Sequence, residues 1–315
     1  MKAIVLKEFG NVGNLSMREI AMPIISETEV LVRVKAISIN PVDVRTRSGS
    51  AMASHLRGLH PIILGWDISG IITEIGQEVS KFKVGDEVFG MVNFVGHGKG
   101  YAEYVAAPES HLALKPQNQS FQGAAAATLA ALTAWQRLVH VAKIKQGDKI
   151  LIQAASGGVG HYAVQIAKNF KAEVIGVSSN DNRKFVLDLG ADQHIAYDKV
   201  KVEEAVSSMD IVIDAFSADS LINSLKMVRE GGTIISLLPF ISDNFLAQAK
   251  EKHVSVHYEL VRSNGSDMNS IAKMMEDGFL TSHISKVFSF EQMTLAHLEM
   301  ERGKTVGKIV ISLKD

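Results

Sequence analysis

Cysteine is absent from this chain of 315 residues. Its absence excludes disulfides, a thiolate nucleophile and every zinc site built with cysteine ligands. Eleven histidines remain, but none belongs to a His-Glu-x-x-His motif, which would place two metal ligands on one face of a helix. We therefore expect no catalytic metal.

An excess of one charge and long apolar runs are also lacking. The formal net charge is −1, which gives no reason to expect nucleic acid or an anionic membrane as partner. No stretch is apolar and long enough to span a bilayer, and the N-terminus starts with a strand-like segment rather than a leader pattern. We expect a cytoplasmic globular protein, which at this length has two domains.

A strand, turn and helix pattern lies between Gly147 and Lys168. The apolar run at 150–152 breaks into small residues and glycines, and apolar residues then resume at helical spacing, as in dinucleotide sites. Gly157 would let the backbone approach a pyrophosphate, and Gly160 would let the helix pack closely on the strand. Ala155 replaces the first glycine of the usual G-x-G-x-x-G pattern, and such glycines also occur for conformational reasons alone.

The pattern of elements divides the chain into a β-rich part and an α/β part. Residues 1 to about 115 show short strands with glycine turns, for example at 30–37, 68–78 and 82–90, which predicts a barrel-like domain. A helical pattern at 123–139 follows, and then short apolar strands alternate with helical segments. This alternation predicts a parallel sheet with helices on both faces. The strands are expected at 150–152, 173–177, 193–196, 211–215, 232–238 and 254–260.

Several motifs together resemble the quinone oxidoreductase and zeta-crystallin branch of the medium-chain dehydrogenase/reductases. Beside the 147–168 stretch, they include Asn40-Pro41-Val42-Asp43, Leu64-Gly65-Trp66-Asp67, Leu132-Thr133-Ala134-Trp135 and Gly307-Lys308, in family order. The resemblance covers essentially the whole chain. It implies a Rossmann-type doubly wound parallel sheet domain at residues 121–262, inserted into a GroES-like β-rich barrel domain formed by residues 1–120 and 263–315. It also implies a homodimer joined through sheet edges at 254–260.

The resemblance further indicates a member without zinc. Zinc-dependent relatives carry a cysteine ligand near position 40 and a Gly-His-Glu motif, which here reads Gly65-Trp66-Asp67. Hydride added to a quinone or another α,β-unsaturated carbonyl leaves a charge spread over a conjugated system, so positioning and a few hydrogen-bond donors can replace a Lewis acid. We therefore expect an NADPH-dependent reductase of a small electrophilic acceptor.

Three residues are candidates for the chemistry. At the positions of Asn40 and Thr133 the family touches the nicotinamide or the substrate, so both are expected to orient the ring and donate to the developing anion. Their plain alternatives are a turn residue before a proline and a buried helix hydroxyl. Asp43 is a further candidate, although an ion pair with Arg45 or Arg47 is the simpler interpretation.

The cofactor preference depends on the end of the second strand of the Rossmann sheet. The family alignment puts Ser178 where NAD-selective sites carry an acid, and the nearby Ser179 and Arg183 could bind a 2′-phosphate, so NADPH is favoured. Tyr197 resembles a tyrosine flanking that phosphate. Phe216 and the segment Leu238-Pro239-Phe240 follow later strands and should border the nicotinamide, with core packing as the alternative for Leu238 and Phe240. The cofactor-binding prediction comprises Ser156, Gly157, Gly158, Val159, Gly160, Ser178, Ser179, Arg183, Tyr197, Phe216, Leu238 and Phe240.

Two other functions stay open at this point. Related folds reduce enoyl thioesters, and a family member could also bind NADPH with only residual reductase activity.

Overall fold

The computed structural model describes residues 1–238 and 240–314, and the chain divides into two compact units. One unit combines Met1–Leu132 with Arg262–Asp315, and the other is the continuous segment Thr133–Val261. The sequence placed the first boundary after residue 120, whereas the first unit continues to Leu132. The reason is that helix α3 (Phe121–Ala126) packs on β3, β5 and β16 of the first unit's sheet.

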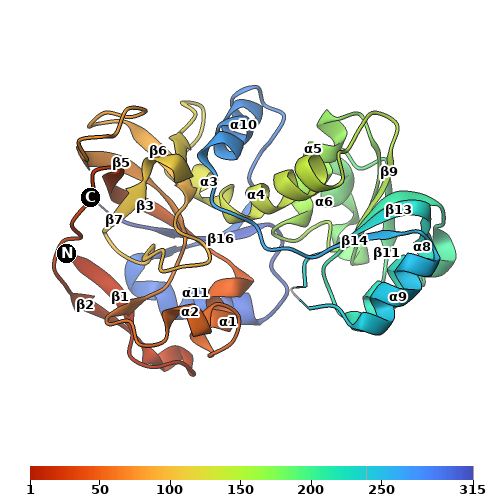
Figure 1. Ribbon diagram of the computed structural model, residues 1–315, viewed down its shortest axis with the longest axis horizontal. Helices are drawn as coiled ribbons and strands as arrows, with labels where there is room; N and C mark the ends of the chain where they lie inside the picture. Colours follow the sequence, from red (N-terminus) through yellow and green to blue (C-terminus); the bar gives the residue numbers. More distant parts are fainter. Residues whose placement is uncertain (239, 315) are drawn as a thin grey trace. The chain divides into compact units, whose positions relative to one another are not determined.

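The first unit is built mainly from antiparallel strands, as the glycine-punctuated pattern predicted (Figure 1). One sheet of seven strands has the order β15-β16-β3-β5-β6-β8 with β7 also paired to β3, and a sheet of three has the order β2-β1-β4. The strands are β1 (Lys2–Leu6), β2 (Leu15–Glu19), β3 (Glu29–Ile39), β4 (Ile62–Ile63), β5 (Asp67–Ile75), β6 (Glu87–Met91), β7 (Tyr104–Pro108), β8 (Leu112–Leu114), β15 (Ile284–Ser289) and β16 (Lys308–Ser312). Besides α3, its helices are α1 (Pro41–Arg47), α2 (Ala53–Leu56), α10 (Gly265–Glu276) and α11 (Met293–Glu301).

Strand β3 is the central strand of this unit and leads directly to one candidate residue. Its Val30, Leu31, Val32 and Val34 are at most 2% exposed, and Arg33 is the exposed residue of the strand, so both faces of β3 are largely covered. The strand ends at Ile39, and α1 begins at Pro41. Proline suits the first position of a helix because its missing N–H would have no partner there. Asn40 is thereby held at the junction of a buried strand and a helix.

The second unit contains the predicted parallel sheet. Its six strands have the order β11-β10-β9-β12-β13-β14, and every pair is parallel. Helices α5 and α6 pack against β9, β10 and β11, and α8 and α9 pack against β12, β13 and β14. The chain builds one half of the sheet from β9 outward to β11 and the other half from β12 outward to β14. Because all crossovers have the same hand, the helices of the two halves cover opposite faces of the sheet. The α/β fold class expected from the sequence is confirmed.

The elements of the second unit follow the predicted alternation closely. Its strands are β9 (Lys149–Ile152), β10 (Glu173–Ser178), β11 (Gln193–Ala196), β12 (Met209–Asp214), β13 (Val228–Ser236) and β14 (Ser255–His257). Its helices are α5 (Gly160–Asn169), α6 (Arg183–Asp188), α7 (Val202–Ala205), α8 (Ala218–Met227) and α9 (Asp243–Glu251). Helix α4 (Leu129–Trp135) and a π-helical turn (Gln136–Val141) precede them.

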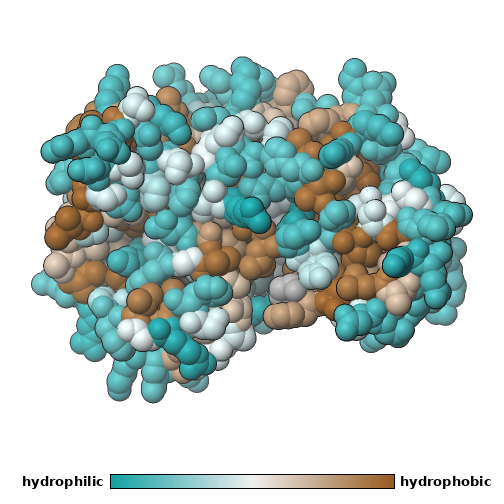
Figure 2. Space-filling model, in the orientation of Figure 1, coloured by the Kyte–Doolittle hydropathy of each residue, from teal (hydrophilic) through white to brown (hydrophobic). Residues whose placement is uncertain are grey.

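The surface in Figure 2 is mostly hydrophilic with scattered hydrophobic residues. Several of the exposed hydrophobic side chains belong to the second unit, among them Tyr197, Phe216, Phe240, Tyr258 and Leu260. Among the described residues, no helix combines the length and the apolar character needed to cross a bilayer.

Candidate functional site

The glycine turn between β9 and α5 is shaped by close backbone packing. Ala154 has a φ of 50°, which is unusual for a residue with a side chain. A Cβ added at Gly160 would lie 2.1 Å from the carbonyl oxygen of Ala154, so only glycine fits at the start of α5. At Gly157 the nearest atoms to an added Cβ belong to Ala154, at 3.2 Å and 3.8 Å. These distances agree with the expected roles, in which Gly160 serves packing and Gly157 serves backbone access.

A hydrogen-bonded bridge ties this turn to the loop after β10. The amide nitrogen of Asn182 donates to the hydroxyls of Ser156 and Ser179, each at 3.1 Å. Gly158 and Val159 lie between Ser156 and the helix and are half-buried. The first N–H groups of a helix lack intrahelical partners and favour anions. Backbone donors and serine hydroxyls are therefore available in one place for phosphate oxygens.

Ser178 occupies the end of β10, but its side chain already has a partner. The hydroxyl lies 2.7 Å from Nε2 of His194 and 3.2 Å from the carbonyl oxygen of Ser179. Both side chains are buried, with Ser178 2% and His194 8% exposed. The guanidinium of Arg183 contacts the His194 carbonyl at 3.5 Å. Burial and the charge of Arg183 lower the pKa of His194, and Asp198 opposes them.

The remaining predicted cofactor residues differ in their exposure. Tyr197 is 55%, Phe216 50% and Phe240 87% exposed, while Leu238 is half-buried. Core packing is therefore the wrong interpretation for Phe240. Its neighbour Pro239 lies outside the described residues.

A cavity of about 410 Å³ in the second unit is lined by Tyr197, Phe216, Gln153 and Val177, among other residues. Its volume falls within the usual range for small-molecule sites. Two of its polar lining residues are fixed by the buried Asp214 carboxylate, which accepts hydrogen bonds from the Gln153 amide at 3.1 Å and the Ser220 hydroxyl at 2.7 Å. An aromatic wall beside fixed amide groups suits a nucleotide base.

In the first unit, the side-chain amide of Asn40 is held from both sides. Its nitrogen donates to Asp67 Oδ2 at 2.7 Å, and its oxygen accepts a hydrogen bond from Lys308 Nζ. Asn40 is 2% and Lys308 also 2% exposed, and Asp67 is fully buried. Because the ammonium group draws electron density from the amide oxygen, the second N–H of Asn40 becomes a stronger donor.

Two buried carboxyl groups surround this amide, and burial raises the pKa of both. Burial and the charge of Asp67 raise the pKa of Asp43 to about 8. Burial also raises the pKa of Asp67, but Lys308 and the Asn40 hydrogen bond oppose that effect. Asp43 Oδ2 accepts the backbone N–H of Asn40 at 2.7 Å. With a pKa of about 8, Asp43 is mainly a neutral acid at neutral pH, and the charge of Lys308 lowers the pKa of both carboxyl groups.

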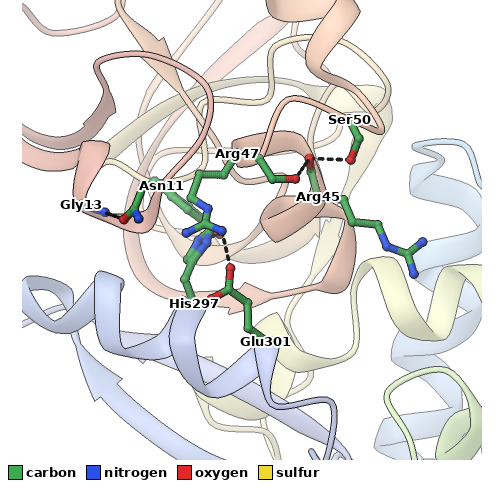
Figure 3. A network of polar contacts seen from close by, with 9 residues as sticks. Asn11, Gly13, Arg45, Arg47, Ser50, His297 and Glu301 are labelled. Atoms are coloured by element: carbon green, nitrogen blue, oxygen red, sulfur yellow. Dashed lines mark hydrogen bonds and ion pairs between the residues drawn. The ribbon is translucent and has the colours of Figure 1, made fainter.

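The arginines of α1 do not pair with Asp43, so the expected ion pair is wrong. Arg47 pairs with Glu301 of α11, and Figure 3 shows His297 beside them. His297 Nε2 lies 3.0 Å from the Tyr101 hydroxyl, and burial with the charge of Arg47 lowers the pKa of this histidine to about 3. Arg45 is exposed, and its side chain points away from this cluster (Figure 3).

Trp66 and Thr133 belong to two of the motifs that resemble the family. Trp66, which stands in place of the zinc-binding histidine of the Gly-His-Glu motif, is 1% exposed and donates its indole N–H to the Gly96 carbonyl at 2.8 Å. Thr133 lies on α4 and is 8% exposed. Within the described parts of the chain, no group of three or more histidine or acidic side chains is placed to hold a metal ion.

The sequence did not assign a role to three residues of these clusters. Asp67 and Lys308 stand in recognised motifs, but only the pairing of β16 with β3 brings Lys308 to Asn40. His194 is a single histidine in a strand, and its contact depends on the parallel pairing of β10 with β11. Lys308, a charged residue at the start of a mostly apolar strand, was the available signal, because buried lysines are rarely left without a partner.

Comparisons with known proteins match most of the chain. Residues 26–117 match the family model described as alcohol dehydrogenase GroES-like domain, and residues 189–311 match the one described as zinc-binding dehydrogenase. The 2-methylene-furan-3-one reductase of Solanum lycopersicum is 31% identical, covering 99% of this chain and 79% of the relative. The quinone oxidoreductase of Sus scrofa is 30% identical over 99% and 98%. The structure of the quinone oxidoreductase from Coxiella burnetii has a TM-score of 0.94 at 35% identity, covering 100% and 99%.

Proposed function

Because the chain belongs to the quinone oxidoreductase branch of the medium-chain dehydrogenase/reductase superfamily, we propose that it is an NADPH-dependent reductase of quinones or other α,β-unsaturated carbonyls. As a member, it is an oxidoreductase with a nicotinamide cofactor. The names of two relatives support the acceptor class, since a quinone and a 2-methylene-furan-3-one both carry a carbonyl conjugated to an alkene. The acceptor, the 2′-phosphate preference and the roles of individual residues are our proposal.

The residues around the glycine turn fit such a cofactor. Ser156, Gly157, Gly158, Val159 and Gly160 would hold the pyrophosphate through backbone donors. The loop residues Ser178, Ser179 and Arg183 would hold the 2′-phosphate, and Tyr197 would flank it. Phe216, Leu238 and Phe240 would border the nicotinamide. When bound, the cofactor supplies hydride, that is, two electrons and one hydrogen nucleus, to a carbon of the acceptor.

The polarised amide of Asn40 is the observation that carries the proposal. Its second N–H would stabilise the negative charge that develops on the acceptor oxygen, and Lys308 behind its carbonyl strengthens that donor. Asp67 accepts the other N–H and so fixes the orientation of the amide. Asp43 positions the backbone at Asn40, and Thr133 would orient the ring. The acceptor takes up one proton from water, which completes a two-electron reduction.

The first test is an NADPH oxidation assay against a panel of acceptors. We expect turnover with quinones and enones, and none with simple ketones, whose localised alkoxide needs stronger stabilisation. Turnover confined to an enoyl thioester or to simple ketones would overturn the acceptor class. No turnover above background with any acceptor would leave a cofactor-binding protein without reductase function.

The second test removes the proposed donor. Asn40→Ala should lower the rate of hydride transfer by about 100-fold, the usual effect of losing one donor to a developing anion. The matched control is Asn269→Ala, an exposed residue of α10. Stopped-flow measurement of NADPH oxidation with a good quinone gives the rate, and the melting temperature checks folding. An unchanged rate in Asn40→Ala would remove this residue from the mechanism.

A further inference from the structure

We propose that His194 sets the hydrogen-bond direction of the Ser178 hydroxyl and so selects an adenosine ribose that carries a 2′-phosphate. This inference rests on the proposed function, because it concerns the nucleotide preference of the same reductase. It assigns a specificity-determining role to a residue that does not need to touch the ligand. His194 acts through Ser178 and is therefore a positioning residue.

The geometry brings the two side chains together on one face of the sheet. In the parallel register His194 of β11 stands opposite Gly176 of β10, and Ser178 lies two residues further along that strand. Side chains two residues apart in a strand share a face, which makes His194 and Ser178 diagonal neighbours. The distance of 2.7 Å between Nε2 and the hydroxyl oxygen is that of a good hydrogen bond.

The single hydroxyl proton decides what Ser178 can offer to a ligand. If Nε2 of His194 carries a hydrogen, Ser178 accepts it, and its own O–H donates elsewhere, here to the Ser179 carbonyl at 3.2 Å. This distance is longer than that of a usual O–H···O bond, so a phosphate oxygen can replace the carbonyl as acceptor. If Nε2 is bare, Ser178 donates to it and offers only lone pairs. A dianionic 2′-phosphate presents only acceptors and requires the donating form, whereas a 2′-hydroxyl is usually bound by an acceptor. The protonation of Nε2 therefore discriminates between the two riboses.

The surroundings of His194 favour the form with hydrogen on Nε2. Nδ1 is buried and has no hydrogen-bond partner among the described residues. A buried donor without a partner is rarer in proteins than an under-used acceptor, which favours a bare Nδ1. The neutral tautomer then carries its hydrogen on Nε2 and leaves the Ser178 proton on its long contact with the Ser179 carbonyl, where a phosphate oxygen can replace the carbonyl as acceptor.

The charges around His194 predict how a ligand changes this histidine. Arg183 of α6 and burial lower its pKa, while Asp198 after β11 raises it. Glu203 and Glu204 belong to α7, which also packs on β11. A 2′-phosphate beside Ser178 would add negative charge and favour the doubly protonated imidazolium, which also has hydrogen on Nε2. Binding of the phosphate should therefore take up a proton.

The closing experiment compares two soluble nucleotides by isothermal titration calorimetry. Adenosine 2′,5′-bisphosphate and adenosine 5′-monophosphate differ only in the 2′-phosphate, so the ratio of their affinities measures the preference. His194→Leu should lower this ratio about tenfold, because it removes the hydrogen bond that orients Ser178. His194→Gln keeps a donor near the position of Nε2 and should retain most of the preference. Gln193→Leu, at an exposed position of the same strand, is the matched control.

The pH dependence separates positioning from simple structural support. For wild-type protein the preference for the 2′-phosphate should rise severalfold as the pH falls from 8 to 6. The reason is that a ligand that raises the pKa of a protein group binds the protein more tightly at lower pH. His194→Gln should lack this component. The second pKa of a phosphate monoester, near 6, affects both proteins equally and cancels in their comparison.

Two further results decide the inference even if His194→Leu folds poorly. Ser178→Ala should lose the same factor, and the double variant should lose no more, because both changes break one interaction. The inference would be overturned if His194→Leu kept the wild-type preference for the 2′-phosphate, or if wild type and His194→Gln had the same pH profile. The proposed function would still stand in that case if the protein oxidised NADPH with an acceptor. A preference that depends on His194 without any reductase turnover would overturn the proposed function alone.

Discussion

Asp43 is a fully buried carboxyl group whose protonation links the candidate site to stability. Its pKa is raised to about 8 by burial and by the charge of Asp67, whereas in an unfolded chain the value is about 3.9. Between these values the folded state binds more protons than the unfolded state. The free energy of unfolding should therefore fall as the pH rises through this window, by at most about 1.4 kcal/mol per pH unit from this group.

Asp43→Asn should remove this slope, because the amide resembles the protonated acid and can still accept the backbone N–H of Asn40. We expect the variant to match wild-type stability near pH 4, at about the unfolded pKa, and to exceed it at pH 8. Urea unfolding at both values measures the difference, with the exposed Asp188→Asn as control. Parallel stability profiles of wild type and Asp43→Asn would show that Asp43 is ionised in the fold.

The sequence predicted individual site residues where they belong to a family motif. Asn40 and Ser178 were found by their positions in the family pattern, and both lie at the ends of buried strands. Their hydrogen-bond partners were missed, since Lys308 and His194 reach them through strand pairing between segments distant in sequence. A contact across a sheet leaves no local pattern, so its partners cannot be read from spacing alone.

At the scale of the elements, the two glycines of the turn between β9 and α5 are expected to have separate roles. Gly160 allows close packing of the helix, and Gly157 gives the ligand access to the backbone. Gly160→Ala should destabilise the second unit by about 1–3 kcal/mol through overpacking and also abolish nucleotide binding, because the new methyl group would lie 2.1 Å from the Ala154 oxygen. Gly157→Ala meets its nearest atom at 3.2 Å and should keep the melting temperature within a few degrees while losing affinity for NADPH. Calorimetry and fluorescence titration measure the two effects. Equal melting temperatures in both variants would contradict the packing role of Gly160.

The elements themselves were predicted best where the periodicity was strong. Strands β3, β10 and β11 agree with their predicted ranges within two residues. The helix expected at 123–139 is divided into α3, α4 and a π-helical turn. Thr128 interrupts it by donating its hydroxyl to the Ala125 carbonyl at 2.8 Å, and Asp67 accepts the N–H of Leu129 at 3.0 Å. The start of α4 is thus fixed by a distant carboxylate that helical periodicity does not reveal.

At the scale of the whole molecule, the edge of the parallel sheet is where we expect a second copy to bind. Strand β14 is the last strand of that sheet, and Tyr258 and Leu260 just beyond it are 38% and 42% exposed. An uncovered edge strand offers its backbone groups to another chain. Light scattering should therefore report a homodimer for the wild-type protein.

Replacing both residues, as Tyr258→Arg with Leu260→Arg, should shift this dimer to monomer because like charges would face each other across the edge. The control is Leu298→Arg, a residue of α11 that is 44% exposed. A monodisperse wild-type monomer would contradict the dimer, and a dimer that survives both arginines would place its interface elsewhere.

The position of β16 also governs the order in which the protein can acquire its structure. This strand lies between β15 and β3 in the seven-stranded sheet, so residues near both chain ends must meet there. The second unit is continuous and leaves the ribosome before residues 308–312 are made. The first unit has high contact order, because β16 pairs with β3 across most of the chain, and this slows folding. A nascent chain halted before Lys308 should therefore carry a folded second unit attached to a sheet that still lacks one of its inner strands.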